Sequence, residues 1–244
     1  MKVVCVTSDK YRNILGSFSK LFNKHWSKDQ EVDILHYKKP DIELPENFKL
    51  VQIGEQSGWN WCWPIVPYLE NLQEEYLFFC MEDHFMFQDM DFDLLNRAED
   101  EIKKSNIGKI MCHYNPRINR EDPGEHYNDD FLIWNLPESH GMNRGPHSLM
   151  ASIWKRDYLL SILYTTRTVS EFESRPIIKD GRYTLFPKKH FVYPQLDACR
   201  AGKFNECVLD ENFVGDHGEF VDDSDRKIFA QAQKDLNNTR DIIE

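Results

Sequence analysis

The sequence predicts an α/β fold, in which a mostly parallel, Rossmann-like central sheet is flanked by helices in a single domain. Short apolar runs alternate with segments whose apolar residues recur at helical spacing, which is the pattern of strand–helix–strand units. Residues 76–81 (YLFFCM) are apolar or aromatic throughout, as is typical of a central strand buried on both faces. The 244 residues, with 41% apolar content, are enough for one large α/β core.

The N-terminal part follows this alternation closely. Strands are expected at residues 3–7, 32–36, 50–53, 76–81 and 107–113. Helices are expected where apolar residues recur every three or four positions, at residues 11–22, 61–72 and 92–104. The order breaks down after Tyr114, because residues 115–146 are rich in Asn, Asp, Glu, Pro, Gly and Arg. Such a composition is typical of a long loop or lid.

The C-terminal part resumes the alternation with shorter elements. A strand at 147–154 and a helix at 156–164 are followed by two short strands at 183–187 and 191–194. The chain ends in a charged helix from about residue 225 to 243, with Ser224 as its expected N-cap. Because no repeat or linker interrupts the chain, we expect one domain over residues 1–244.

Composition excludes several functional classes. The formal charge of -11 and pI of about 5.3 argue against nucleic acid as a partner, since phosphate backbones require basic surfaces. No apolar run is long enough to cross a membrane, and the N-terminal run is too short for a signal peptide. The six cysteines form no CxxC pair, and Cys5, Cys80 and Cys112 lie in apolar runs. We therefore expect reduced thiols and a cytoplasmic location.

Two acids and a histidine follow the most apolar strand. Glu82, Asp83 and His84 come directly after residues 76–81, and ligands of open α/β sheets bind beyond the carboxyl ends of the strands. Carboxylate oxygens suit Mg²⁺, while an added imidazole suits Mn²⁺ better. A metal held there could bind a phosphate. The alternative is that these residues form a solvated loop.

Two further segments have the composition of a nucleotide or sugar site. Thr7, Ser8 and Asp9 follow the first strand and precede a helix, where backbone N–H groups favour anions. Asp9 could instead accept a hydrogen bond from a nucleoside, or Ser8 and Asp9 could simply cap the helix. Three tryptophans, among them Trp61, occur within residues 59–63. Their faces suit sugar rings and nucleobases, and the alternative is core packing.

Two glutamates flank Phe172 and are the candidate bases. In an extended chain Glu171 and Glu173 would place both carboxylates on one side, and one of them could deprotonate a hydroxyl. The alternative is a solvated acidic turn. Basic residues near the C-terminus could neutralise a diphosphate, and a late histidine could complete a metal site; they are Lys188, Lys189, His190, Arg200, Lys203 and His217.

Taken in order, these segments resemble a family of GT-A-fold glycosyltransferase-like proteins of bacterial and viral surface-glycan biosynthesis. The resemblance covers roughly residues 1–205, in pieces; the matching pieces are residues 6–11, 18–26, 59–63, 76–85 and 151–160. Ser170-Glu171-Phe172-Glu173 is similar to the family's Trp-Glu-Phe-Glu segment, with Ser170 where the tryptophan usually stands. This chain has Glu82-Asp83 where the family has paired aspartates or Asp-x-Asp.

The resemblance implies a nucleotide-sugar donor and a glycan acceptor. Residues 1–114 would bind the donor, through Thr7, Ser8, Asp9, Trp61, Glu82 and Asp83. Residues 147–244 would bind the acceptor, with residues 115–146 as a loop or lid.

The resemblance also implies a mechanism. Mn²⁺ or Mg²⁺ held by Asp83, with Glu82, would stabilise the leaving diphosphate. Glu173 would deprotonate the acceptor hydroxyl and give inversion at the anomeric carbon, and Glu171 is the next candidate for this role.

Two other functions remain open. A nucleotidyltransferase would use a similar sheet, but it normally carries a glycine-rich phosphate loop after the first strand, and residues 7–10 (TSDK) contain no glycine. A non-catalytic glycan- or nucleotide-binding protein on a transferase fold would explain why Glu82 and His84 replace the family's usual residues.

Overall fold

The computed structural model describes residues 1–57, 60–113, 125–134, 147–174, 180–188, 193–200, 203–209 and 221–240. Contacts group the chain into two compact units that alternate along the sequence. Unit 1 comprises residues 1–2, 55–79 and 91–193, and unit 2 comprises residues 3–54, 80–90 and 194–244. The expected division of the chain on either side of residues 115–146 therefore does not coincide with a boundary between these units.

Unit 2 begins with three parallel strands and the helix that follows the first of them. The strands lie in the order β3 (Phe48–Gln52), β2 (Val32–His36), β1 (Lys2–Val6). A short 3-10 helix η1 (Arg12–Ile14) leads into α1 (Leu15–His25). The apolar positions of α1 are buried because they recur at helical spacing; they are Leu15, Phe18, Leu21 and Phe22.

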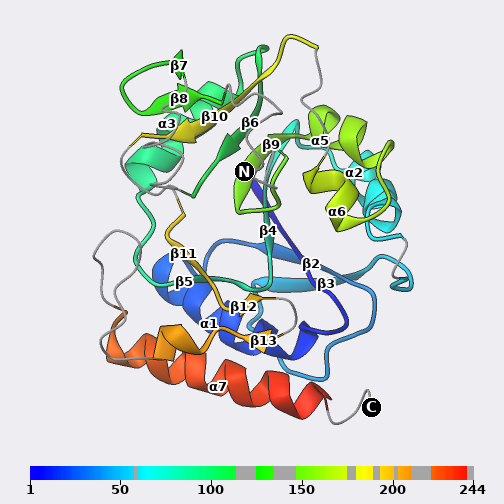
Figure 1. Ribbon diagram of the computed structural model, residues 1–244, viewed down its shortest axis with the longest axis vertical. Helices are drawn as coiled ribbons and strands as arrows, with labels where there is room; N and C mark the ends of the chain where they lie inside the picture. Colours follow the sequence, from blue (N-terminus) through cyan, green and yellow to red (C-terminus); the bar gives the residue numbers. More distant parts are fainter. Residues whose placement is uncertain are drawn as a thin grey trace. The chain divides into compact units, whose positions relative to one another are not determined.

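The rest of unit 2 adds short elements and the longest helix among the described residues. In order they are β5 (His84–Met86), β11 (Gln195–Asp197), β12 (Cys199–Arg200), β13 (Lys203–Phe204), η3 (Glu206–Leu209) and α7 (Asp223–Arg240). Strands β5 and β11 pair antiparallel, as do β12 and β13. Helix α7 lies beside α1 (Figure 1), and Ser17 Oγ donates to the carbonyl of Ile228 at 3.2 Å.

Unit 1 is built on a mixed sheet. Its strands lie in the order β4 (Tyr76–Met81), β9 (Ser152–Lys155), β6 (Ile107–Met111), β10 (Tyr183–Pro187), β8 (Phe131–Ile133), β7 (Glu125–His126). The last two residues of β4 belong to unit 2. Strands β6 and β10 are parallel, and the other neighbouring pairs of this unit are antiparallel.

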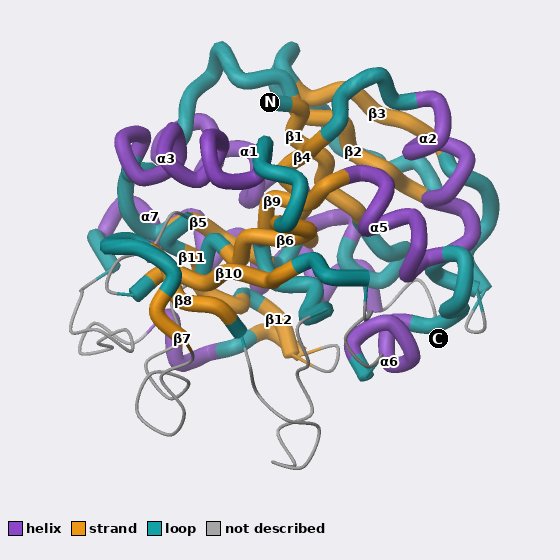
Figure 2. Tube along the Cα trace, turned by 90° about the horizontal axis from the view of Figure 1, so that it is seen from above, coloured by secondary structure: helices purple, strands orange, loops and turns teal. Residues whose placement is uncertain are grey.

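Unit 1 also contains helices, of which two pack against its central strands. The described helices are η2 (Trp63–Ile65), α2 (Val66–Asn71), α3 (Phe92–Ile102), α5 (Arg156–Leu163) and α6 (Val169–Glu173). Helices α3 and α5 both contact β6 and β9 (Figure 2). Gly108 in β6 permits this packing, since a Cβ atom there would lie 2.8 Å from the ring of Tyr158.

The α/β class expected from the sequence is confirmed, and several details differ. The loop expected at 115–146 contains β7 and β8 in its described part, residues 125–134. The strand expected from residue 147 begins only at Ser152, and residues 193–194 precede a strand rather than form one. Asp222 rather than Ser224 caps α7, because its Oδ1 accepts from the Ser224 and Asp225 N–H groups at 2.7 and 3.0 Å.

Two expectations about the whole chain can be compared with the described residues. None of the described helices has the length and apolar character needed to cross a membrane. Five of the six cysteines have described side chains, and all five are buried free thiols: Cys5, Cys62, Cys80, Cys112 and Cys199.

Candidate active site

Glu82 joins the end of β4 to the turn that follows β1. Its side chain is fully buried, and Oε1 accepts three hydrogen bonds: from Ser8 N–H at 2.8 Å, from Ser8 Oγ at 3.1 Å and from Thr7 Oγ1 at 3.2 Å. The structure thus brings together three residues that the sequence predicted for ligand binding. The Ser8 N–H, which we expected to face an anion, is instead bound to this carboxylate.

The electrostatic environment of Glu82 is unusual for a buried acid. Burial raises the pKa of Glu82 to about 7, although the hydrogen bonds from Ser8 and Thr7 act in the opposite direction. Oε2 has no hydrogen-bond partner within the described part of the chain. A buried carboxylate oxygen without a partner is costly, and such under-compensated acids are concentrated at functional sites.

Asp83 is more accessible and lies among other acids. The Asp83 side chain is 20% exposed, and its backbone carbonyl accepts a hydrogen bond from Ala198 N–H at 2.8 Å. Burial raises the pKa of Asp83 well above its usual range, and the charges of Glu82 and Asp197 raise it further. Asp197 was missed in the sequence because only the pairing of β11 with β5 brings it opposite His84.

His84 is not placed as a metal ligand. Its Nδ1 accepts from Met81 N–H at 3.3 Å, so a neutral ring carries its proton on Nε2, which lies 3.8 Å from Asp83 Oδ1. The expected triad of Glu82, Asp83 and His84 is therefore not the arrangement observed. Within the described ranges, no group of three or more His, Cys, Asp or Glu side chains is arranged to hold a metal ion.

The acids nevertheless fit a hard divalent cation. Mg²⁺ and related ions are commonly held by one or two carboxylates, with phosphate oxygens and water completing the shell. Asp83 offers a partly exposed carboxylate of this kind, and Glu82 Oε2 is a further oxygen without a protein partner among the described residues. The donor set thus suits a cation bound together with a phosphate ligand.

Asp9 connects the turn after β1 to the segment after β2. Its Oδ1 accepts from Lys38 N–H at 2.9 Å, and its carbonyl accepts from Arg12 Nη1 at 2.6 Å. Neither Ser8 nor Asp9 caps a helix, because η1 begins after Tyr11 and has no side-chain cap. The capping alternative is therefore excluded for both residues.

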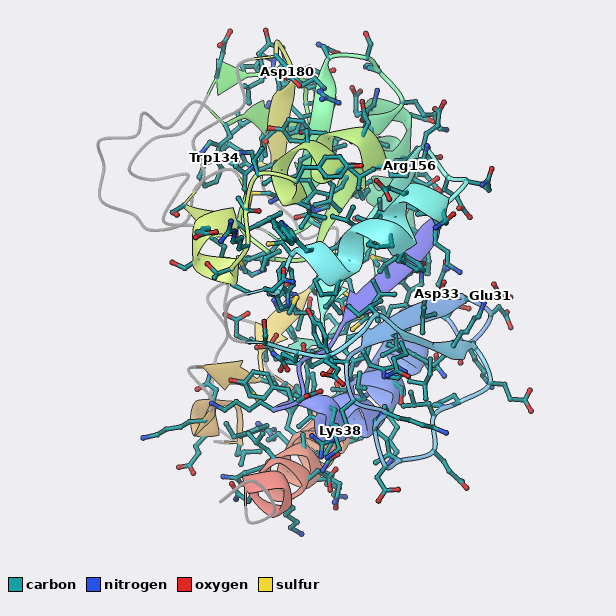
Figure 3. All side chains as sticks on the ribbon, turned by 90° about the vertical axis from the view of Figure 1, so that its right-hand side faces the viewer. Glu31, Asp33, Lys38, Trp134, Arg156 and Asp180 are labelled. Carbon is teal, nitrogen blue, oxygen red and sulfur yellow. The ribbon has the colours of Figure 1, made fainter. Side chains whose placement is uncertain are left out.

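A cavity of about 1100 Å³ in unit 2 is lined in part by two residues that are bonded to Asp9. Arg12 and Lys38, both bonded to Asp9, contribute to its wall; Lys38 is labelled in Figure 3. The remaining wall comes from Asn13, α1, residues 39–45 and α7. Lys20 and Lys39 add two more cations to this wall.

In unit 1, the structure separates the two candidate bases. Thr168 and Glu171 form a capping box at the start of α6: Glu171 N–H donates to Thr168 Oγ1 at 3.1 Å, and Glu171 Oε2 accepts from Thr168 N–H at 3.4 Å. The same oxygen accepts from Arg167 N–H at 2.7 Å. The segment is helical, so the expected extended chain with both carboxylates on one side is wrong. The Thr168-x-x-Glu171 spacing was a readable signal for this cap.

Glu173 is half-buried and lies near a buried lysine. Its Oε1 accepts from Leu149 N–H at 3.1 Å. Burial lowers the pKa of Lys109 to about 7, and the charge of Glu173 opposes this shift. Lys109 was missed in the sequence, although a lysine inside the apolar run 107–111 was a signal.

Trp61 packs in the core of unit 1. Its ring is buried and meets Phe172 edge-on at 6.2 Å between centroids, and the backbone N–H of Trp61 donates to the carbonyl of Arg167 at 2.8 Å. The structure therefore supports core packing for Trp61 rather than the expected stacking on a ligand. Trp63 is 48% exposed with the Arg167 guanidinium 5.3 Å from its ring, and Trp59 lies outside the described residues.

The predicted basic region is only partly described. Lys188 Nζ donates to the carbonyl of Asn128, so this lysine is engaged by the β7–β8 hairpin. Lys203 is exposed on β13. The other members fall outside the described residues or have side chains that are not described; they are Lys189, His190, Arg200 and His217.

Three solved structures are similar to this chain at low sequence identity. A cytidylyltransferase from Leptospira borgpetersenii serovar Hardjo-bovis is 11% identical with a TM-score of 0.49, covering 98% of this chain and 95% of that chain. Mannosyltransferase PcManGT from Pyrobaculum calidifontis, in complex with GDP-Man and Mn²⁺, is 11% identical with a TM-score of 0.42, covering 98% and 73%. S. aureus TarS 1-349 is 13% identical with a TM-score of 0.43, covering 76% of this chain and 60% of that chain.

This chain thus spans 60% of the length of the TarS 1-349 chain. Neither a protein-family model nor a curated protein sequence matches it.

Proposed function

We propose that the protein is a glycosyltransferase that moves a sugar from a nucleotide-sugar donor to a hydroxyl group of a glycan acceptor. The observation that carries the proposal is the acid pair after β4. Glu82 is buried and accepts hydrogen bonds from uncharged donors of the β1 turn, and the partly exposed Asp83 follows it. Two acids at the carboxyl end of a strand can be compensated by a divalent cation that binds together with a phosphate ligand.

In this proposal residues of unit 2 bind the nucleotide-sugar donor. Asp83 would hold Mn²⁺ or Mg²⁺ against the donor diphosphate, and such a cation, when bound, stabilises the diphosphate as it leaves. Glu82 fixes the turn that carries Thr7, Ser8 and Asp9. The cavity next to Arg12 and Lys38 is large enough for a nucleoside. Its wall carries charges of both signs: Arg12, Lys20, Lys38 and Lys39, together with Asp41, Glu43 and Asp235.

In this proposal Glu173 of unit 1 activates the acceptor hydroxyl group. One of its carboxylate oxygens is held by Leu149 N–H, which orients the group for proton transfer. Glu173 takes the proton of the acceptor hydroxyl, whose oxygen forms a bond to the anomeric carbon. The bond from that carbon to the diphosphate oxygen breaks, and the configuration inverts. Glu171 no longer competes for this role, because its carboxylate caps α6.

The donor assignment is tested by thermal unfolding with UDP, GDP and CDP, each with and without Mn²⁺. At least one nucleotide should raise the melting temperature in the presence of metal, because a ligand of the native state stabilises it. Asp83→Asn should abolish that increase and lower sugar transfer by about 100-fold or more. The exposed Asp100→Asn is the matched control and should change neither. No stabilisation by any nucleotide would contradict the proposal, and pyrophosphate release from a nucleoside triphosphate would indicate a nucleotidyltransferase instead.

The base assignment is tested by Glu173→Gln. Turnover should fall by about 10²- to 10⁴-fold, while the nucleotide-dependent increase in melting temperature is kept, because proton transfer is lost without loss of donor binding. Glu171→Gln is the matched control, since Gln also completes a capping box. Full turnover in the Glu173→Gln protein would remove Glu173 as the base.

A further inference from the structure

A buried lysine and the candidate base bind opposite sides of one peptide group. Lys109 on β6 is fully buried, and its Nζ donates to the carbonyl oxygen of Ser148 at 2.6 Å. The N–H of the same peptide group belongs to Leu149 and donates to Glu173 Oε1 at 3.1 Å. A continuous path of hydrogen bonds therefore runs from the lysine through the 148–149 peptide to the glutamate, within unit 1.

We propose that Lys109 is a positioning residue for Glu173, and that it holds and polarises the Ser148–Leu149 peptide so that the Glu173 carboxylate is oriented and kept ionised. This inference rests on the proposed role of Glu173 as the base. An ammonium group on the carbonyl withdraws electron density, which makes the N–H on the other side a stronger donor. A stronger donor to Oε1 favours the carboxylate over the acid.

The surroundings of Lys109 make this charge effective. Its Nζ lies 4.3 Å from the centre of the Trp154 ring, and the ring of His147 in turn stacks near Trp154, at 6.5 Å between centroids. This aromatic wall keeps water out, so the interaction along the peptide is screened less than it would be at the surface. The wall also explains why the pKa of Lys109 is lowered to about 7.

Several charged or titratable groups face this region. Glu173 on α6 and Cys112 after β6 act on Lys109 directly, and His147 lies against the aromatic rings. On α5, burial raises the pKa of Tyr158 to about 12, so it stays neutral. The charges of Asp180 and Arg182, in the segment before β10, also act on Tyr158. The Arg182 guanidinium lies 4.7 Å from the centre of the Tyr158 ring.

Replacing Lys109 should have different effects depending on whether this lysine only fills space or positions Glu173. If Lys109 only filled space, replacing it with methionine would keep the volume and remove a buried charge, which is often neutral or stabilising. The pH profile of kcat/KM would then stay as it is in the wild type. If Lys109 positions Glu173, the rising limb of that profile must move to higher pH when the ammonium group is removed.

The test is a ¹³C NMR titration of the Glu173 side chain, assigned by the signal that disappears in Glu173→Gln, together with the pH dependence of kcat/KM. In Lys109→Met we expect the Glu173 titration and the rising limb of the pH profile to move upward together, by about one pH unit. A shift of this size lowers kcat/KM tenfold at pH values below the rising limb and leaves kcat/KM unchanged at pH values above it. Lys109→Gln keeps a neutral donor to the carbonyl oxygen of Ser148. In this variant the pH profile should move in the same direction by a smaller amount.

Lys103→Met is the matched control, because Lys103 lies in unit 1 as well, is 54% exposed and is paired with Asp100 at 2.9 Å. It should leave the titration unchanged. An unchanged Glu173 titration in both Lys109 variants would overturn the inference even if Glu173 proves to be the base. Full activity of Glu173→Gln would instead overturn the proposed base, while the NMR titration would still report whether Lys109 and Glu173 are coupled.

Discussion

Glu82 and Asp225 are two fully buried acids of unit 2 with opposite surroundings. Asp225 is neutralised by cations: its Oδ2 lies 2.8 Å from His25 Nε2, and its Oδ1 accepts from Lys24 Nζ at 2.7 Å. Glu82 receives hydrogen bonds from a backbone amide and two hydroxyl groups. Burial is therefore the same for the two acids, while the compensation of their charge is not.

The difference separates a structural acid from a candidate functional one. Asp225 joins the start of α7 to the end of α1, where charges of both signs meet. Glu82 lies at the carboxyl end of β4, where one of its oxygens has no partner within the described part of the chain. Residues that break the rule of paired buried charges are expected where a ligand completes the site.

Removing the compensated acid should have the largest effect on stability. Asp225→Ala leaves His25 and Lys24 without their buried partner, so the free energy of unfolding should fall by about 3–5 kcal/mol in urea denaturation. Asp89, the other partner of His25, is 86% exposed and provides the control. Asp89→Ala should cost less than about 1 kcal/mol, as exposed pairs do. Equal losses in the two variants would show that burial of the partner does not matter here.

Removing the uncompensated acid should change how stability depends on pH. Because the pKa of Glu82 rises from 4.5 to about 7 on folding, its contribution is fully present below pH 4.5 and is lost as the pH rises to about 7. Glu82→Gln does not titrate. The variant's free energy of unfolding relative to the wild type should therefore increase by about 3 kcal/mol between pH 4 and 8. Urea denaturation with a chelator present measures this difference, and a constant difference would contradict it.

The smallest effect is expected for the histidine that compensates Asp225. Burial alone would lower the pKa of His25, but its hydrogen bonds to Asp225 and Asp89 outweigh burial and raise it. Its stabilising contribution is thus fully present below pH 6.5 and is lost as the pH rises through the higher value of the folded state. The free energy of unfolding of the wild type relative to His25→Gln should decline over that pH range. An increase of this difference with pH would contradict the raised pKa of His25. The effect is limited because Lys24 still neutralises Asp225.

Much of the fold followed from local sequence patterns. Strands β2 and β10 begin and end at the residues expected, because each is a short apolar run between polar segments. The turn at Thr7 and Ser8 and the acids after β4 were correctly singled out, although the roles assigned to them differ from the contacts observed. Strand β8 was harder to predict, since it lies in a segment with the composition of a loop, while its residues pair with β10.

The candidate site was predictable only in part. Glu173 and Glu171 look equivalent in the sequence, and the helix made them different by placing Glu171 in a cap. Asp197 and Lys109 escaped notice because their partners are distant in sequence: Asp197 lies near Asp83 through strand pairing, and Lys109 reaches Glu173 through the 148–149 peptide.

The sequence by itself determined the alternation of the main strands and helices in the N-terminal part and placed two carboxylates at the end of an apolar strand, because apolar spacing and turn residues act over a few neighbouring positions. The tertiary structure alone decided which of these carboxylates is buried and what each one contacts. Ser8 meets Glu82 across 74 positions of the chain. Burial and partners of this kind set the pKa and the accessibility of an acid, and neither is encoded within a short segment.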